Sequence, residues 1–137
     1  MTTFSPIPAY FLGAACFMRG IMAIFLPREE YDNMGLPLEP GFPGKHDDDI
    51  SRRNDSVSPL MYFKGLRELT FGASLVAFRW QGHERALTTF TAILSLTRLG
   101  DGLVVWLNGG EELRLKAVGH WITAAGFGWW ALWRSRF

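Results

Sequence analysis

The chain of 137 residues is long enough for one domain, and its formal net charge of +1 gives no reason to expect nucleic acid as a partner. A single cysteine, Cys16, excludes an internal disulfide and any CxxC metal or redox motif. Apolar residues make up 48% of the chain and gather in four blocks, at about residues 9–26, 60–78, 86–107 and 115–133. Each block approaches the ~20 residues that an α-helix needs to cross a bilayer core.

The first block follows MTTFSPIPAY, which lacks the basic region of a signal peptide, and it is closed by Pro27. We therefore expect this block to be kept as a helix. The next segment, residues 27–59, is rich in proline and carries the acidic run 47–49. This composition predicts a long loop with a short helix near one end. Such a loop either folds over one mouth of the bundle as a lid or stays solvated.

The remaining blocks are joined by short connections around RWQGHER and NGGEEL, so neighbouring helices should run antiparallel. A soluble four-helix bundle would need a broad polar face repeated at helical spacing. The fourth block, AVGHWITAAGFGWWALW, has one ionisable residue and no such face. Its tryptophans precede two arginines, as in a membrane-interface belt, and Gly119, Gly126 and Gly128, with Ala124, are typical of close helix packing. The prediction is all-α: a four-helix transmembrane bundle forming a single domain, residues 1–137.

Ionisable side chains interrupt every apolar block. They are Arg19, Lys64, Arg67, Glu68, Arg98, Asp101 and His120. A charge in lipid is costly, and it is tolerated when it faces the bundle interior and has a partner. Lys64, Arg67 and Glu68 share one helical face by their i, i+3, i+4 spacing, and Arg98 and Asp101 share another. If these faces meet, two carboxylates lie near two guanidiniums, and the remaining cation and histidine complete a ring from the first and fourth blocks.

Four cations against two anions leave a positive surplus within the blocks. The surplus indicates an anionic ligand, a charge that reaches the interface, or a change of protonation. Lys64 and Arg19 are the side chains best placed to reach a headgroup. A purely structural alternative is a buried lattice of ion pairs that fixes helix register.

Two carboxylates in unequal surroundings can divide acid and base roles, as the opening of an epoxide requires. His120 is a second candidate proton carrier, although a lone histidine on an apolar helix is more often a packing residue. Asn108 lies two turns beyond Asp101 on the same side. Three histidines without an HExxH pattern, and the absence of a Gly-rich phosphate loop, predict neither a metal nor another cofactor.

Three short motifs resemble a known group of proteins: GLRELTFG in the second block, RLGDGLVV in the third and GHW in the fourth. Together they resemble small four-helix membrane proteins related to the DoxX-like group, among them the membrane epoxide hydrolases of the aurovertin, citreoviridin and asteltoxin pathways. The resemblance implies hydrolysis or cyclising opening of an apolar polyketide-derived epoxide by a multi-pass protein of the endoplasmic reticulum. It implies that Arg67, Glu68, Arg98 and Asp101 form the site, with His120 beside them.

On this reading Asp101 is the base or nucleophile and Glu68 the acid, while the arginines hold the carboxylates and the developing oxyanion. Substrate would contact Arg19, Lys64, Asn108 and the aromatic rings of Tyr62 and Trp106. The expected partners are the epoxide and the lipid bilayer, and homo-oligomerisation is left open. Two other functions fit the same residues: a small-molecule or proton-coupled transporter subunit, and a non-catalytic membrane anchor that holds a soluble enzyme through the acidic loop.

Overall fold

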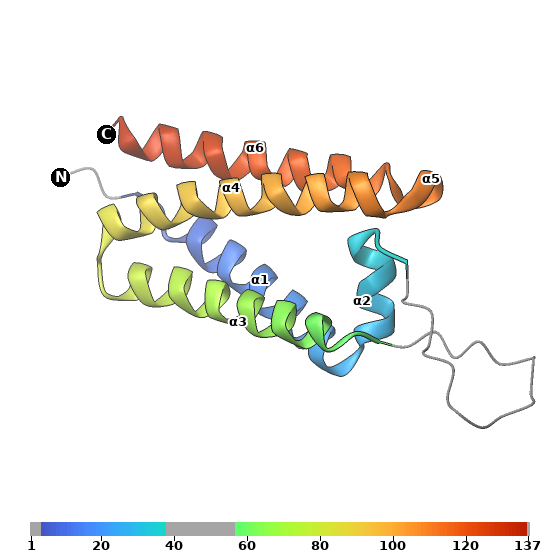
Figure 1. Ribbon diagram of the computed structural model, residues 1–137. Helices are drawn as coiled ribbons and strands as arrows, with labels where there is room; N and C mark the ends of the chain where they lie inside the picture. Colours follow the sequence, from blue (N-terminus) through green and yellow to red (C-terminus); the bar gives the residue numbers. More distant parts are fainter. Residues whose placement is uncertain (1–3, 38–56, 137) are drawn as a thin grey trace, which may run out of the picture.

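The computed structural model describes residues 4–37 and 57–136, and every regular element in these ranges is a helix (Figure 1). The helices in chain order are α1 (Ile7–Phe25), α2 (Pro27–Met34), α3 (Pro59–Trp80), α4 (Glu84–Asn108), α5 (Gly110–Leu113) and α6 (Lys116–Ser135). The all-α prediction is confirmed for these residues. The segment predicted as a long loop with a short helix near one end, 27–59, begins with α2, which corresponds to that helix. Its acidic run 47–49 lies outside the described residues.

Proline, serine and glycine set several helix boundaries. Ser58 precedes α3, and its hydroxyl accepts a hydrogen bond from the Leu60 amide at 3.3 Å, while Pro59 occupies the first helical position. Gly35 ends α2 with φ of +85°, a left-handed conformation in which a residue without a Cβ is unstrained. Helix α2 therefore stops after eight residues, and Leu36 packs back against the cluster of Ala23, Tyr31 and Met61.

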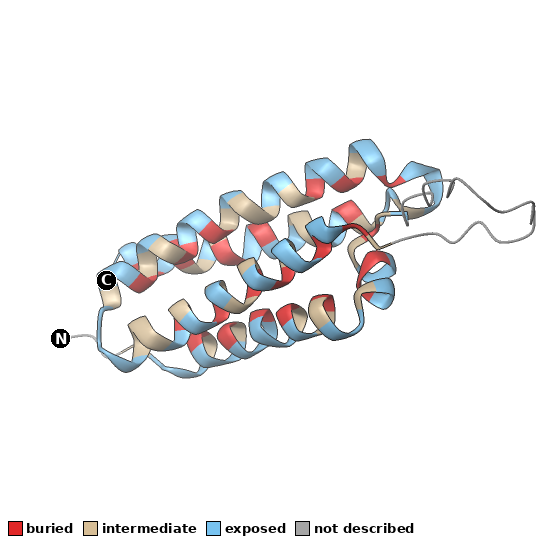
Figure 2. Ribbon diagram, turned by 60° about the horizontal axis from the view of Figure 1, so that its bottom comes forward, coloured by how far each residue is buried: buried red, intermediate tan, exposed pale blue. Residues whose placement is uncertain are grey.

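The four long helices form two layers, α1 with α3 and α4 with α6 (Figure 1). The packing within each layer is much more extensive than the packing between the layers. Helix α2 stands across one end of both layers, and α1 begins at the same end at which α6 finishes (Figure 1). Figure 2 shows buried positions along the facing sides of these helices and exposed positions along their outer sides.

Small residues allow α1 and α3 to approach closely. Buried positions recur every three or four residues on both helices, the spacing of a coiled-coil seam. A Cβ added at Gly72 would lie 2.6 Å from the carbonyl oxygen of Gly13, and one at Gly20 would lie 2.8 Å from the carbonyl oxygen of Gly65. The two backbones therefore touch at two levels, which no larger residue would allow.

Most glycines of the fourth block do not lie at close helix contacts, contrary to the prediction from the sequence. Close packing was predicted at Gly119 and Gly126, yet no atom lies within 4 Å of a Cβ added at either position. Only Gly128 meets a neighbour, the hydroxyl of Ser95 at 3.0 Å. The buried small residues of α6 are alanines, at positions 117, 124 and 131, so Ala124 is confirmed among the predicted close-packing positions. The glycine pattern alone did not identify which face of α6 is packed.

Large apolar side chains lie on the outside of all four long helices. Phe11, Phe63, Leu96 and Ile122 are each 67–71% exposed, one on each helix. Within the described residues, α1 and α4 are long and apolar enough to cross a membrane. The charged side chains of the apolar blocks, by contrast, largely turn inward, and their arrangement defines the candidate site.

Candidate functional site

A ring of four charged side chains, here called the quartet, connects α3 and α4. It consists of Arg67, Glu68, Arg98 and Asp101. Arg98 donates Nη1–H to Glu68 Oε1 at 2.9 Å and Nη2–H to Glu68 Oε2 at 2.6 Å. Glu68 is completely buried. Because both of its oxygens accept from one planar guanidinium, the pair has the two-bond geometry of an ionised carboxylate with arginine.

The second half of the quartet is more open. Arg67 Nη2 lies 3.1 Å from both carboxylate oxygens of Asp101, and Arg98 Nη1 lies 3.5 Å from Asp101 Oδ2. The Asp101 side chain is 17% exposed. Arg67 Nη2 closes the ring at 3.7 Å from Glu68 Oε1. Two cations therefore neutralise two anions, with the fully buried carboxylate held the more tightly.

Helix α2 supplies a third carboxylate that sequence reasoning did not include. Glu30 is completely buried; its Oε1 lies 2.8 Å from Arg19 Nη2 and also forms an ion pair with Lys64. The other oxygen, Oε2, has no hydrogen-bond partner among the described residues. Arg19 and Lys64, the two cations expected to reach the membrane interface, are therefore both paired inside the protein. Glu30 was not among the predicted site residues because the segment around it was predicted to be mainly loop.

Two residues of α6 hold α2 in place. Lys116 forms an ion pair with Asp32 at 3.3 Å and also donates to the Asp32 carbonyl. His120 Nε2 lies 3.1 Å from the carbonyl oxygen of Met34. Because a carbonyl only accepts, Nε2 carries the hydrogen. In a neutral ring Nδ1 is then the nitrogen that keeps a lone pair and can accept a proton.

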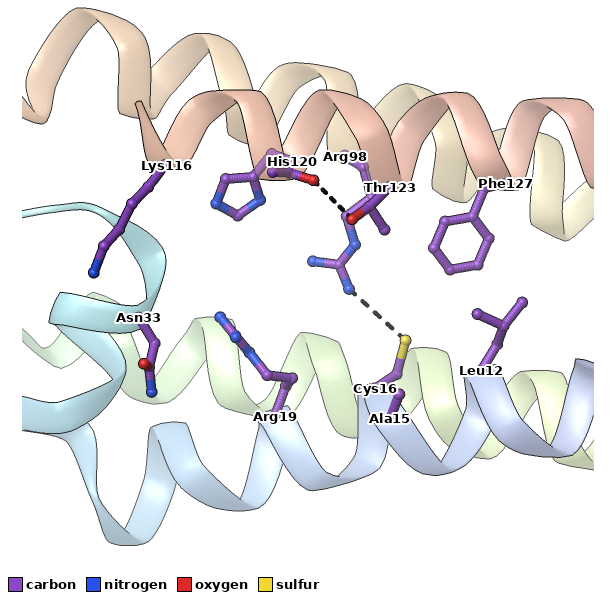
Figure 3. Close-up of a pocket in the computed structure, with 11 residues that line it drawn as sticks. Leu12, Ala15, Cys16, Arg19, Asn33, Arg98, Lys116, His120, Thr123 and Phe127 are labelled. Atoms are coloured by element: carbon purple, nitrogen blue, oxygen red, sulfur yellow. Dashed lines mark hydrogen bonds between the residues drawn. The ribbon is translucent and has the colours of Figure 1, made fainter. Parts of the chain in front are cut away.

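A pocket of about 300 Å³ lies between α1, α2 and α6, with Arg98 reaching into it from α4 (Figure 3). Its lining residues are Leu12, Ala15, Cys16, Arg19, Asn33, Arg98, Lys116, Gly119, His120, Thr123 and Phe127. Three of these are cations and none carries a carboxylate. Arg98 Nη2 also lies 3.7 Å from Cys16 Sγ at the pocket wall. Arg98 therefore joins the pocket to the carboxylates of the quartet, which do not line it.

The other residues predicted to contact substrate lie elsewhere. Tyr62 is 44% exposed, and Asn108 donates to the Val104 carbonyl of its own helix at 2.8 Å. Trp106 packs against Trp121 with ring centroids 5.6 Å apart. Of the predicted set, the pocket collects Arg19, Arg98 and His120. It adds side chains that no motif singled out, chiefly Cys16, Asn33 and Lys116, because their proximity depends on how α2 folds back.

The described residues contain no group of three His, Cys, Asp or Glu side chains close enough to hold a metal ion. The pocket instead presents a set of fixed hydrogen-bond donors around a small space. Three guanidinium or ammonium groups and one imidazole converge there from α1, α4 and α6 (Figure 3). Such a set can bind an anion or stabilise negative charge that develops on an oxygen.

In the described residues, the fold and this site define an all-helical protein with a partly buried Arg–carboxylate quartet beside a cation-lined pocket. The chain belongs to the family described as domain of unknown function DUF4267, whose sequence model matches residues 13–134. That span contains the quartet, Glu30 and the pocket, apart from Leu12 on its edge. No curated protein and no solved structure matches the chain.

Proposed function

We propose that the protein is a membrane-embedded enzyme that opens an epoxide ring in an apolar, polyketide-derived substrate, giving a diol or a cyclic ether. The observation that carries the proposal is the position of Arg98. Its guanidinium lines the pocket and is held from behind by both carboxylates of the quartet. A guanidinium fixed in this way can meet an oxygen on which charge develops. The resemblance of the three sequence motifs to membrane epoxide hydrolases supports the same reaction.

A location in the bilayer is part of this proposal. Support comes from the large apolar side chains exposed on α1, α3, α4 and α6, combined with charges that are paired in the interior. This inside-out distribution is the one that lipid requires. All four long helices would then span the membrane, and an apolar substrate dissolved in the bilayer would reach the pocket from the side. The endoplasmic reticulum is the membrane that the family resemblance suggests.

The proposed reaction starts with attack on an epoxide ring carbon. The C–O bond breaks as the nucleophile bonds to carbon, and the oxygen leaves as an alkoxide. Arg98 donates N–H to that oxygen from the pocket wall. Glu68 is a positioning residue in this scheme, since both of its oxygens are occupied by Arg98. Arg67 and Asp101 complete the support on the far side of the guanidinium.

The base in this scheme is His120. Its Nε2–H is directed to the Met34 carbonyl, which leaves Nδ1 as the acceptor. In hydrolysis, Nδ1 takes a proton from the attacking water and then returns it to the alkoxide, so that epoxide and water give a diol and the imidazole is regenerated. In cyclisation a hydroxyl of the same substrate replaces water. The assignment from the sequence, with Asp101 as base or nucleophile and Glu68 as acid, is kept as the competing mechanism.

Substitutions that preserve hydrogen bonding separate the two mechanisms. His120→Gln keeps a donor for the Met34 carbonyl but removes the base, and His83→Gln changes an exposed histidine as a matched control. Purified protein in lipid nanodiscs would be incubated with a polyene epoxide, and diol or cyclic ether measured by mass spectrometry. Loss of turnover in His120→Gln, with Asp101→Asn retaining at least a tenth of the rate, supports the imidazole as base.

The opposite pattern, with Asp101→Asn inactive and His120→Gln active, supports the carboxylate mechanism instead. Circular dichroism of each variant establishes that the helices are intact. If the unmodified protein forms neither product from any polyene epoxide, while proteoliposomes containing it accumulate the compound, the enzyme proposal is overturned in favour of the transporter alternative.

A further inference from the structure

The charges linked by ion pairs around the pocket do not balance. The cations are Arg19, Lys64, Arg67, Arg98 and Lys116, and the carboxylates paired with them are Glu30, Asp32, Glu68 and Asp101. Among the ion pairs around the pocket in the described residues, 4–37 and 57–136, five positive groups thus face four negative ones, which leaves one positive charge in excess. Inclusion of Glu30 has reduced the surplus read from the sequence, but it has not removed it.

Three cations of this cluster, Arg19, Arg98 and Lys116, line the pocket. The side chains of Arg19 and Lys116 are 37% and 39% exposed. None of the paired carboxylates lines the pocket: Glu30 and Glu68 are completely buried, and Asp32, the partner of Lys116, is 76% exposed. A ligand in the pocket therefore meets ammonium and guanidinium groups directly, and the counter-charges of Arg19 and Arg98 are buried away from it. An anion is the ligand that this field favours.

The pocket is also polarised along its length. Figure 3 shows Lys116, Asn33 and Arg19 toward α2, Arg98 and Cys16 in the middle, and Leu12 with Phe127 at the far end. Because α1 and α6 belong to different layers and pack mainly on other helices, the pocket opens between them. One end therefore suits a charged head group and the other suits the beginning of an apolar chain. A volume of about 300 Å³ holds a head group and a short part of such a chain.

We infer that this pocket binds the carboxylate head of a single-chain amphiphile. One carboxylate neutralises the one surplus charge, whereas a phosphate monoester brings about −1.5 to −2 at pH 7 and exceeds it. The binding follows from the pocket alone. If the pocket is also the active site, the epoxide substrate itself carries a carboxylate. This second statement rests on the proposed function.

Gly119 offers a way to fill the pocket without changing a charge. It lines the pocket on α6, and no atom lies within 4 Å of an added Cβ, so Gly119→Leu places a side chain into open space. Gly126→Leu is the matched control, since that glycine is on the same helix, is equally open and does not line the pocket. Both changes raise helix propensity by a similar amount, so only occupation of the pocket distinguishes them.

The test is equilibrium binding of radiolabelled dodecanoate to the protein in zwitterionic nanodiscs, with protein-free nanodiscs as the baseline for partitioning. We expect saturable binding of one dodecanoate per chain. Gly119→Leu should weaken it at least tenfold and Gly126→Leu should leave it unchanged. Arg19→Gln and Lys116→Gln should each weaken it about tenfold, whereas Arg85→Gln, which removes an exposed charge from the first turn of α4, should not.

Two further probes define the chemistry of the head group. Dodecanol, with the same chain and no charge, should show no saturable binding. Equal binding of dodecanol, or an unchanged affinity in Gly119→Leu, overturns the inference, and tighter binding of dodecyl phosphate overturns the assignment to a carboxylate. Dodecanoate binding without turnover of any epoxide would defeat the proposed reaction alone. Turnover without dodecanoate binding would defeat this inference alone.

Discussion

The guanidinium of Arg98 in α4 donates two side-by-side hydrogen bonds, of 2.9 and 2.6 Å, to the carboxylate of Glu68 in α3, across the interface between the two helix layers. Helix α3 packs mainly on α1, and α4 packs mainly on α6. The ion pair is therefore one of the polar connections, with Arg67–Asp101 and Arg79–Glu84, between layers that otherwise share few close contacts. It also holds the Arg98 guanidinium at the pocket wall.

Removing one partner of this pair should be strongly destabilising. Arg98→Met removes both hydrogen bonds to the completely buried Glu68 and leaves it only Arg67 at 3.7 Å, and breaking a buried pair in this way costs about 3–5 kcal/mol. The measurement is the free energy of unfolding in mixed micelles, followed by circular dichroism as denaturing detergent is added. The double variant Arg98→Met with Glu68→Leu removes both charges and should recover most of the loss. A double variant as unstable as the single one would contradict this account of the pair.

Substitution of Gly72 by alanine should separate α1 from α3. The new Cβ would lie 2.6 Å from the Gly13 carbonyl oxygen, and a backbone atom cannot move aside as a flexible side chain can. We expect destabilisation of about 1–3 kcal/mol, the usual effect of overpacking. Gly126→Ala is the control with the opposite sign: nothing lies within 4 Å of its added Cβ, so it should gain up to about 1 kcal/mol from helix propensity. Thermal unfolding of both variants in one detergent decides the comparison.

Residue spacing predicted that the quartet would form if the charged faces of the second and third blocks met, and they do. Arg67 and Glu68 are adjacent on one helix, Arg98 and Asp101 are three residues apart on the next, and the short turn between these helices makes them neighbours. Charge in an apolar helix is so unfavourable when unpaired that local periodicity alone indicated where each side chain must point. The prediction concerned two helices joined by a short turn, and inference from residue spacing is strongest for such neighbouring elements. The same prediction placed Arg19 and His120 in that ring, whereas they contact Glu30 and the Met34 carbonyl instead.

Residue spacing could not predict the pocket. The pocket depends on Glu30, Asn33 and Met34 of α2, a helix that begins at Pro27 and is capped by Gly35. Sequence periodicity extends over one helix at a time, and it does not say onto which side of a bundle a short helix folds back. The open space at Gly119 was likewise hidden, because glycine is common both where helices touch and where they leave a gap.

Glu84→Gln should loosen the end of the bundle opposite α2. The Glu84 carboxylate forms ion pairs with Arg79 at the end of α3 and with the buried Arg134 at the end of α6. Arg134 keeps a hydrogen bond to the Thr88 hydroxyl at 3.0 Å but loses its counter-charge. A loss of about 2 kcal/mol is expected, as for hydrogen bonds to charged groups. Denaturant titration should show this loss, while Glu112→Gln, at an exposed position of α5, should show none.

Glu30→Gln should release α2 without unfolding the layers that it covers. The glutamine keeps the shape of the side chain but removes the negative charge that holds Arg19 and Lys64, so both cations lose their shared partner. Hydrogen exchange should then accelerate at least tenfold in the amides of α2, while the amides of α3 and α4 keep their protection. Glu29→Gln makes the same change one residue earlier at an exposed position and should leave exchange unaltered. Equal acceleration in the two variants would show that α2 is held by its apolar contacts around Tyr31, and not by the buried carboxylate.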